Sequence, residues 1–238
     1  MRRGRPRARV SPVDGTWRVH KPPGVTSFQR FKEVVHELEL RAGSRLRACH
    51  GGTLDPFAEG LLLVLVGEAV HGFEALHRLP KTYVADVRWG IETDNLDPTG
   101  AVVREGTVPR AGLDEALAGF IGFTEQVPPA TSAKRVGGER AYARVHRGEP
   151  VQLPPSRVYV HAARWLIHGD TWSRIEIVCA GGFYVRALAR DVATRLATVA
   201  HLSRLERSRI GPYVDEPGLH HGGEPGWAPP AGWPFPLS

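Results

Sequence analysis

A single carboxylate, Asp55, stands between a glycine pair and an unbroken apolar run in the segment CHGGTLDPFAEGLLLVLVGEA, residues 49–69. The run LLLVLV, residues 61–66, is bounded by glycines and predicts a short strand buried on both faces. Pro56 disfavours the helical conformation for the residue before it, so we expect Asp55 to be extended on a loop held by a rigid strand. A carboxylate aimed in this way can act as a nucleophile. The alternative interpretation is a turn aspartate that hydrogen-bonds within its own loop.

Four further polar residues stand beside apolar or glycine-rich stretches. Lys21 opens the rigid turn KPPGVTS, Tyr83 lies in an alternating segment, and Tyr184 and Arg186 follow the sequence CAGG. A flat aromatic ring and an arginine fork near a carboxylate suit a planar ring attached to phosphate. Each residue also has a plain structural interpretation, with Tyr83 as strand packing and Arg186 as a charge on a helix surface.

The elements that must position these side chains alternate without a strict βαβ order. A helix is predicted over 25–40, because Thr26 and Gln29 form a capping box before an apolar stripe of Phe28, Phe31, Val35 and Leu38. Alternating apolar residues predict a half-buried strand over 81–90. The remaining predictions are a short helix over 111–122, a loop over 124–138, strands over 157–169 and 172–185, and an amphipathic helix over 184–197. This mixture predicts an α+β fold.

Bulk properties limit the possible classes of protein. The 238 residues are 42% hydrophobic, enough for one large domain with a real core, and no apolar stretch approaches the ~20 residues of a membrane span. Two cysteines cannot form a disulfide framework, so we expect a cytoplasmic protein. The basic start MRRGRPRARV has no apolar segment after it and is not expected to be a secretory signal.

The net charge of +6 is distributed unevenly. Five arginines of the first ten residues account for most of it. Residues 181–211 carry six arginines against Asp191 and Glu206. Such a segment could face a polyanion, or it could be an ordinary solvated helix face.

The sequence lacks the motifs of several common enzyme classes. It contains no G-x-S-x-G elbow, no Walker A run and no G-x-G-x-x-G after a strand. The eleven histidines have no H-E-x-x-H or C-x-x-C companion. We therefore expect neither a metal nor a cofactor.

Both ends of the chain are compositionally biased. Residues 1–12 are basic and residues 214–238 are rich in proline, glycine and tryptophan, so both are expected to be poorly ordered. Proline and glycine are expected to preclude regular structure in the C-terminal segment. A single domain is expected over 13–213.

Taken together, the motifs resemble the TruB family of tRNA pseudouridine synthases over residues ~16–213. Five segments match in the family's order, and a sixth resembles its closing arginine-rich segment. They read VHKPPGVTSF, HGGTLDPFAEGLLLVLVGEA, KTYVADVRWGIETDNLDPTG, QVPPATSAKRVGGERAY, CAGGFYVRALARDV and AHLSRLERSRIGPY.

The resemblance implies a role for each matching residue. Asp55 takes the place of the catalytic aspartate, and His50 that of the histidine that helps splay the T-loop. Tyr83 matches the tyrosine stacked on the target base. The other implied positions are Tyr184 and Arg186 lining the pocket, with Arg186 bridging to Asp55, Lys21 as a structural or active-site lysine, Leu205 as an apolar wall, and Arg135 where the RNA-contacting loop of the family has lysine.

The same resemblance implies a pseudouridine synthase fold, with a mixed, mostly antiparallel central sheet flanked by helices and loops. It implies isomerisation of the uridine at position 55 of the tRNA T-arm, with tRNA as partner and without metal or cofactor, by a protein expected to be a monomer. Residues 214–238 are expected to be too short for the PUA domain that family members often carry. Two alternatives stay open: a non-catalytic tRNA-binding or tRNA-folding protein, and a guide-RNA-dependent relative.

Overall fold

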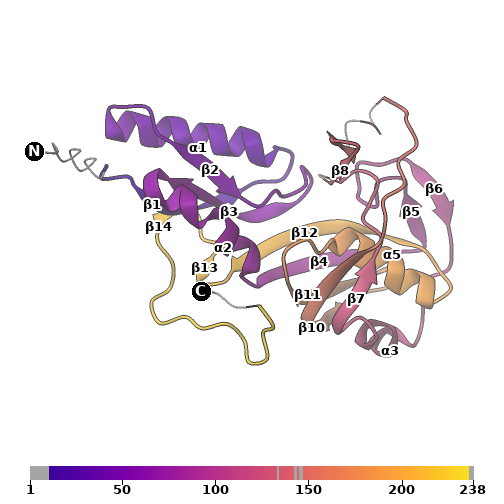
Figure 1. Ribbon diagram of the computed structural model, residues 1–238. Helices are drawn as coiled ribbons and strands as arrows, with labels where there is room; N and C mark the ends of the chain where they lie inside the picture. Colours follow the sequence, from indigo (N-terminus) through magenta and orange to yellow (C-terminus); the bar gives the residue numbers. More distant parts are fainter. Residues whose placement is uncertain (1–10, 133, 142–143, 145–146, 236–238) are drawn as a thin grey trace, which may run out of the picture.

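The computed structural model describes residues 11–132, 134–141, 144 and 147–235, with only the backbone described for Arg135, Val136 and Arg140. It confirms the expected α+β class, with helices packed on a large mixed sheet (Figure 1). The helices are α1 Ser27–Ala42, the 3₁₀ helix η1 Gly67–Gly72, α2 Phe73–Arg78, α3 Leu113–Ala118 and α5 Val185–Arg195. The strands are β1 Gly15–Lys21, β2 Ala48–Gly51, β3 Glu59–Val66, β4 Lys81–Trp89, β5 Ile91–Thr93, β6 Val102–Glu105, β7 Gly122–Gln126, β8 Arg135–Val136, β9 Glu139–Arg140, β10 Ser156–His168, β11 Trp172–Cys179, β12 Ala200–Ile210, β13 Tyr213–Val214 and β14 Leu219–His221.

The described residues form one ten-stranded sheet and two short hairpins, β5–β6 and β8–β9. The strand order of the large sheet is β14-β1-β3-β12-β4-β11-β10-β7, with β2 paired to β3 and β13 paired to β12. Among the described pairs, β3–β12 is parallel and every other pair is antiparallel. The mixed, mostly antiparallel sheet expected from the sequence is therefore confirmed.

Strand β3 is buried on both faces, as its apolar run predicts. Leu62, Val64 and Val66 pack with α1 in one apolar cluster. Leu61, Leu63 and Leu65 pack with Leu76 of α2 in another. Because successive side chains of a strand point to opposite faces, helices on both sides require the unbroken apolar run seen here. Figure 1 shows α1 and α2 on opposite sides of this part of the sheet.

The parallel pair β3–β12 is the seam between the two halves of the sheet, pairing Glu59 with Glu206 and Gly60 with Arg207. Gly60 has φ +104°, and a Cβ there would lie 2.5 Å from the Arg207 carbonyl oxygen. No side chain fits at that distance, so glycine is required for the two strands to pair.

The other half of the sheet carries the largest apolar cluster, between α5, α3 and strands β4, β10, β11 and β12. Val185, Leu188 and Val192 of α5 are buried in it, as the predicted amphipathic helix requires. Helix α5 ends at Arg195, two residues before the end of the predicted range.

Helix α1 begins at the predicted capping box. The Thr26 hydroxyl accepts from the Gln29 backbone N–H, and the Gln29 side chain accepts from the Thr26 N–H. The predicted apolar stripe is partly wrong, because Val34 and Leu38 are the buried apolar residues of the helix and Phe28 is 58% exposed.

Three other segments also differ from expectation. The loop predicted over 124–138 begins with the end of β7, which pairs with β10, and contains β8, whose partner β9 follows directly after the loop. Residues 200–210 form a central strand that the sequence patterns do not predict. Val214 belongs to β13 and strand β14 pairs with β1, so the expectation that proline and glycine preclude regular structure after residue 213 is wrong for these four residues.

Beyond β14, the C-terminal segment crosses to the other half of the sheet (Figure 1). The Trp233 ring lies 5.7 Å from that of Tyr159 on β10, and its indole N–H donates to the Arg78 carbonyl. No helix in the described part of the chain is long and apolar enough to cross a membrane.

We predict that Leu62→Ala lowers the free energy of unfolding by about 2–5 kcal/mol, because it empties a fully buried site under α1. Urea unfolding measures the change. Leu40→Ala on the exposed face of α1, where the side chain is 71% exposed, serves as control and should stay within about 0.5 kcal/mol of the parent. Equal effects of the two substitutions would contradict the packing described here.

Candidate active site

Asp55 and Arg186 form a bidentate ion pair at the edge of the main apolar cluster. Arg186 Nε donates to Asp55 Oδ2 at 2.8 Å and Nη2 donates to Oδ1 at 2.9 Å. The Arg186 side chain is 3% exposed and that of Asp55 is 31% exposed. Two parallel bonds fix the plane of the carboxylate. Asp55 therefore presents a fixed carboxylate edge to the surface, and the interpretation of Arg186 as a helix-surface charge is wrong.

The guanidinium of Arg186 has all five of its donors occupied. Besides the two bonds to Asp55, Nη1 donates to the Asn95 carbonyl at 2.7 Å and to Thr131 Oγ1 at 2.9 Å. Nη2 also donates to the Thr131 carbonyl at 3.1 Å. An arginine has five N–H groups, so none is left for a phosphate. Arg186 therefore acts on a ligand through Asp55 and not by direct contact through its N–H groups.

The loop that carries Asp55 is fastened on its N-terminal side by Ser27, the first residue of α1. The buried Ser27 hydroxyl donates to the Leu54 carbonyl at 3.1 Å and accepts from the Leu54 N–H at 2.8 Å. Both main-chain groups of the residue before Asp55 are thus satisfied by one side chain. The Ala58 N–H closes the turn on the Asp55 carbonyl at 3.1 Å.

Lys21 fastens the other side of the same loop from a fully buried position. Its ammonium donates to the carbonyls of Pro22, Val25 and Pro56, the last at 3.3 Å. Desolvation lowers the pKa of Lys21 to about 8, against the opposing charge of Asp55. Of the two roles that the resemblance implied for Lys21, these contacts support the structural one.

Tyr83 lies on β4, opposite Arg207 of β12, and packs against the main apolar cluster. Burial raises the pKa of the Tyr83 phenol, and the nearby Arg207 opposes this rise through its charge and a hydrogen bond. The Asp55 carboxylate adds to the rise, and Leu54, next to Asp55, belongs to the cluster against which Tyr83 packs. The phenol is therefore neutral at physiological pH.

Tyr184 is the residue before α5, and the Gln126 side chain holds its backbone. The Tyr184 N–H donates to Gln126 Oε1 at 2.9 Å, and its carbonyl accepts from Gln126 Nε2 at 3.1 Å. Burial raises the pKa of the Tyr184 phenol; Asp55 adds to the rise, and Ser132 and Arg186 oppose it. A second neutral aromatic side chain therefore belongs to the surroundings of Asp55.

The remaining expected residues have different positions. His50 lies on β2 with its ring 5.5 Å from that of Phe31. Leu205 is buried in the main cluster that also contains Leu54. Arg135 belongs to β8, and its side chain lies outside the described part of the structure.

Sequence reasoning missed several residues that build this site. Arg207 is 2% exposed, with Nε donating to the Leu61 carbonyl and Nη2 to the Gly52 carbonyl. The sequence places it among charges that could face a polyanion, and no local pattern distinguishes it from the exposed arginines. Ser27, Gln126 and Thr131 carry no signal of their own, because their partners come from distant parts of the chain.

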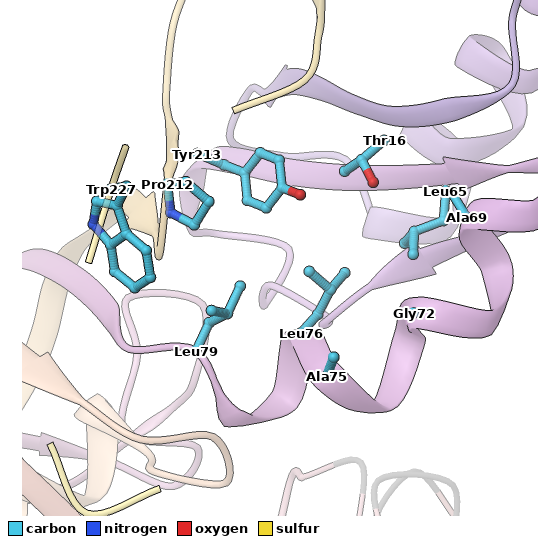
Figure 2. Close-up of a pocket in the computed structure, with 10 residues that line it drawn as sticks. All are labelled: Thr16, Leu65, Ala69, Gly72, Ala75, Leu76, Leu79, Pro212, Tyr213 and Trp227. Atoms are coloured by element: carbon cyan, nitrogen blue, oxygen red, sulfur yellow. The ribbon is translucent and has the colours of Figure 1, made fainter. Parts of the chain in front are cut away.

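A separate cavity of about 400 Å³ lies away from these residues (Figure 2). Figure 2 shows Leu76 and Leu79 pointing toward the Tyr213 ring. None of the expected site residues lines it, and none of its lining residues has a charged side chain. The lining residues are Thr16, Leu65, Ala69, Gly72, Ala75, Leu76, Leu79, Pro212, Tyr213 and Trp227. Within the described ranges, no group of three or more His, Cys, Asp or Glu residues is placed to hold a metal ion.

Comparison with known proteins finds a family model described as "TruB family pseudouridylate synthase (N terminal domain)", which matches residues 40–185. The tRNA pseudouridine synthase B of Treponema pallidum (strain Nichols) is 39% identical over 230 residues, covering 86% of this chain and 62% of that protein. That of Bordetella avium (strain 197N) is 35% identical over 210 residues, covering 86% of this chain and 84% of the relative. This chain thus spans less than two thirds of the Treponema protein's length.

Among solved structures, the chain resembles one described as "Crystal Structure of a Cbf5-Nop10-Gar1 Complex". The TM-score is 0.62 at 26% identity, and the match covers 85% of this chain and 50% of that chain. This likeness agrees with the fold expected from the sequence.

We predict that Ser27→Ala lowers the free energy of unfolding by about 1–3 kcal/mol, because it leaves the N–H and carbonyl of Leu54 without partners in a buried site. Urea unfolding measures the change. Ser44→Ala, at an exposed position after α1, is the matched control and should have no measurable effect. A Ser27→Ala protein as stable as the control would show that the hydroxyl does not fasten the loop.

Proposed function

The chain belongs to the TruB family of pseudouridylate synthases, and from that premise we propose that it isomerises uridine to pseudouridine in tRNA, at position 55 of the T-loop. The observation that carries the proposal is the carboxylate of Asp55, fixed by two bonds from a buried guanidinium and open on its other side. A site built for binding an RNA backbone alone would have no use for an exposed carboxylate, because it repels phosphates.

The proposed reaction conserves every atom of the nucleotide. The bond between N1 of uracil and C1′ of ribose breaks, the base turns, and C5 forms the new bond to C1′. The C5 proton is lost and N1 gains a proton, so the product is an isomer of the substrate. No oxidant, reductant or group donor takes part.

One carboxylate is sufficient for this chemistry. Asp55 attacks C1′ as a nucleophile, or it stabilises the electron-poor sugar and removes a proton from it; both routes need the ionised form. The two bonds from Arg186 occupy one lone-pair direction on each oxygen and leave others for the ribose. The loop contacts of Ser27 and Lys21 hold the carboxylate in one orientation, which lowers the entropic cost of reaching a reactive geometry.

The two tyrosines give the flipped base its surroundings. Tyr83 and Tyr184 both have phenols whose pKa is raised by burial and further by Asp55. Neutral rings accept a uracil by stacking without adding a charge beside the reacting carboxylate. We propose that Tyr83 stacks on the target base and that Tyr184 forms the opposite wall.

The target atom lies inside a folded loop of RNA, so the nucleotide must leave its stack before it reaches Asp55. His50, on β2 at the start of the Asp55 loop, is proposed to hold the rearranged loop. Leu205, buried on β12, is proposed to form an apolar wall of the site. These roles follow from the family positions and from the placement of the elements around Asp55.

We predict that Asp55→Asn lowers the rate of isomerisation by several orders of magnitude, while the variant still binds tRNA. The substitution removes the charge and keeps the size of the side chain. The assay measures pseudouridine in unmodified tRNA after incubation with purified protein, without guide RNA and without cofactor. Because asparagine offers one acceptor oxygen to two Arg186 donors, folding of the variant is verified by circular dichroism.

Asp170→Asn is the matched control, since Asp170 is exposed in the turn between β10 and β11. It should retain the activity of the parent. Rapid pseudouridine formation by Asp55→Asn would refute the catalytic assignment. Activity of the parent only with an added guide RNA would favour the guide-dependent class, and binding without activity would favour the non-catalytic class.

We predict that prolonged treatment with EDTA leaves turnover of a pre-folded T-arm stem-loop nearly unchanged, because the isomerisation needs no electron transfer and one carboxylate suffices. The pre-folded stem-loop separates the enzyme's needs from those of RNA folding, since magnesium also stabilises the RNA. The measurement compares initial rates with EDTA and with excess magnesium. A loss of turnover that metal restores, on RNA shown to remain folded, would contradict the prediction.

A further inference from the structure

One large aromatic side chain near the candidate site is exposed without a structural reason. Phe28, in the first turn of α1, is 58% exposed, whereas Val34 and Leu38 provide the buried apolar contacts of this helix. The fold does not need a phenyl ring at this position. A single exposed apolar residue is common on protein surfaces, so the neighbours of Phe28 decide whether its ring belongs to a binding surface.

Phe28 does not stand alone. Its ring stacks on that of Phe31, with centroids 6.2 Å apart and planes inclined by 26°. The Phe31 ring in turn lies 5.5 Å from the ring of His50. These three residues, here called the aromatic row, therefore run from the exposed start of α1 to β2.

The aromatic row is joined to the Asp55 loop by the first residues of α1. Ser27, next to Phe28 in the chain, is the residue whose hydroxyl binds both main-chain groups of Leu54. Phe28 and Asp55 are thus each one residue away from the same pair of hydrogen bonds. These two hydrogen bonds hold the exposed end of the aromatic row and the Asp55 loop together.

The charges at this place suit a nucleic acid. Lys32 lies one helical turn from Phe28, with its ammonium 5.3 Å from the centre of the ring. The first turn of α1 contains no acidic residue, and the N-terminal end of a 16-residue helix carries a partial positive charge. A base can stack on the ring while its phosphate meets the ammonium.

We propose that the aromatic row is a stacking site for an unpaired base of the substrate RNA next to the target uridine. Removing the target from its stack leaves a neighbouring base with an exposed face. Phe28 offers that face a flat apolar partner, and Lys32 pairs with the phosphate of the same nucleotide. This inference rests on the proposed function, because it names how the RNA of that reaction is held.

The test measures RNA affinity and base stacking in the Asp55→Asn background, where the substrate is not consumed. A T-arm stem-loop carries the fluorescent base 2-aminopurine on either side of the target uridine in turn. Stacking on an aromatic side chain quenches its fluorescence. We expect quenching at one of the two positions with Phe28 present and its loss in Phe28→Ala, together with affinity weakened about 5- to 100-fold.

Four further variants separate stacking from other effects. Phe28→Tyr keeps a ring and should restore quenching and affinity, whereas Phe28→Leu keeps only apolar area and should not. Lys32→Gln should reduce the slope of log affinity against log salt by about 0.7, the value for one phosphate on a single strand. Leu40→Ala, on an exposed position far along the same helix, should change nothing.

Unchanged affinity and quenching in Phe28→Ala, with its melting temperature equal to that of the parent, would overturn the proposal and leave the exposed ring to a partner other than RNA. That outcome would leave the proposed function intact as long as Asp55→Asn alone stops isomerisation. If Asp55→Asn remains active, the proposed function itself fails, whatever Phe28 does.

Discussion

The bidentate contact between Arg186 and Asp55 is the interaction on which the arrangement of the site depends. A guanidinium buried to 3% exposure is costly unless each donor is paired and a counter-charge is close. Meeting that requirement brings together Asp55, the Asn95 carbonyl and two acceptors of Thr131. Three distant segments of the chain thus converge on one side chain of α5, and their loops take their positions from it.

The carboxylate on the other side of this pair is held as firmly as the guanidinium. Ser27 fixes the residue before Asp55, and Lys21 binds the carbonyl of the residue after it. Neither side chain needs to contact a ligand. Their effect is to remove conformational freedom from one loop before any ligand arrives, which lowers the entropic cost of binding. The desolvation that lowers the pKa of Lys21 is tolerated because three carbonyls satisfy its ammonium.

Local patterns are sufficient to predict the parts of this fold whose partners lie nearby in sequence. The capping box of α1, the doubly buried β3 and the alternation of β4 all follow from short-range rules. Strand β12 escapes prediction because its register shifts twice against β4, between Leu202 and Arg204 and between Arg207 and Arg209, which breaks the period of two. Its charged residues also suggest a solvated surface, although Arg207 is buried by carbonyls that no local pattern announces. Phe28 differs from expectation because helical spacing assigns this apolar residue to the core, whereas its side chain is exposed.

The parallel seam between β3 and β12 limits the order in which the parts of the protein can fold during synthesis. Arg207 reaches the Leu61 carbonyl across 146 positions of sequence, and Arg186 reaches Asp55 across 131. Contacts so distant in sequence form slowly, and the ribosome delivers the N-terminal partner of each long before the C-terminal one. Strands β1 to β3 therefore leave the ribosome while the edge of β3 that pairs with β12 is still unpaired. At that stage Asp55 has no guanidinium partner. A nascent chain therefore lacks the complete arrangement of Asp55, Arg186 and Arg207 until β12 has been synthesised.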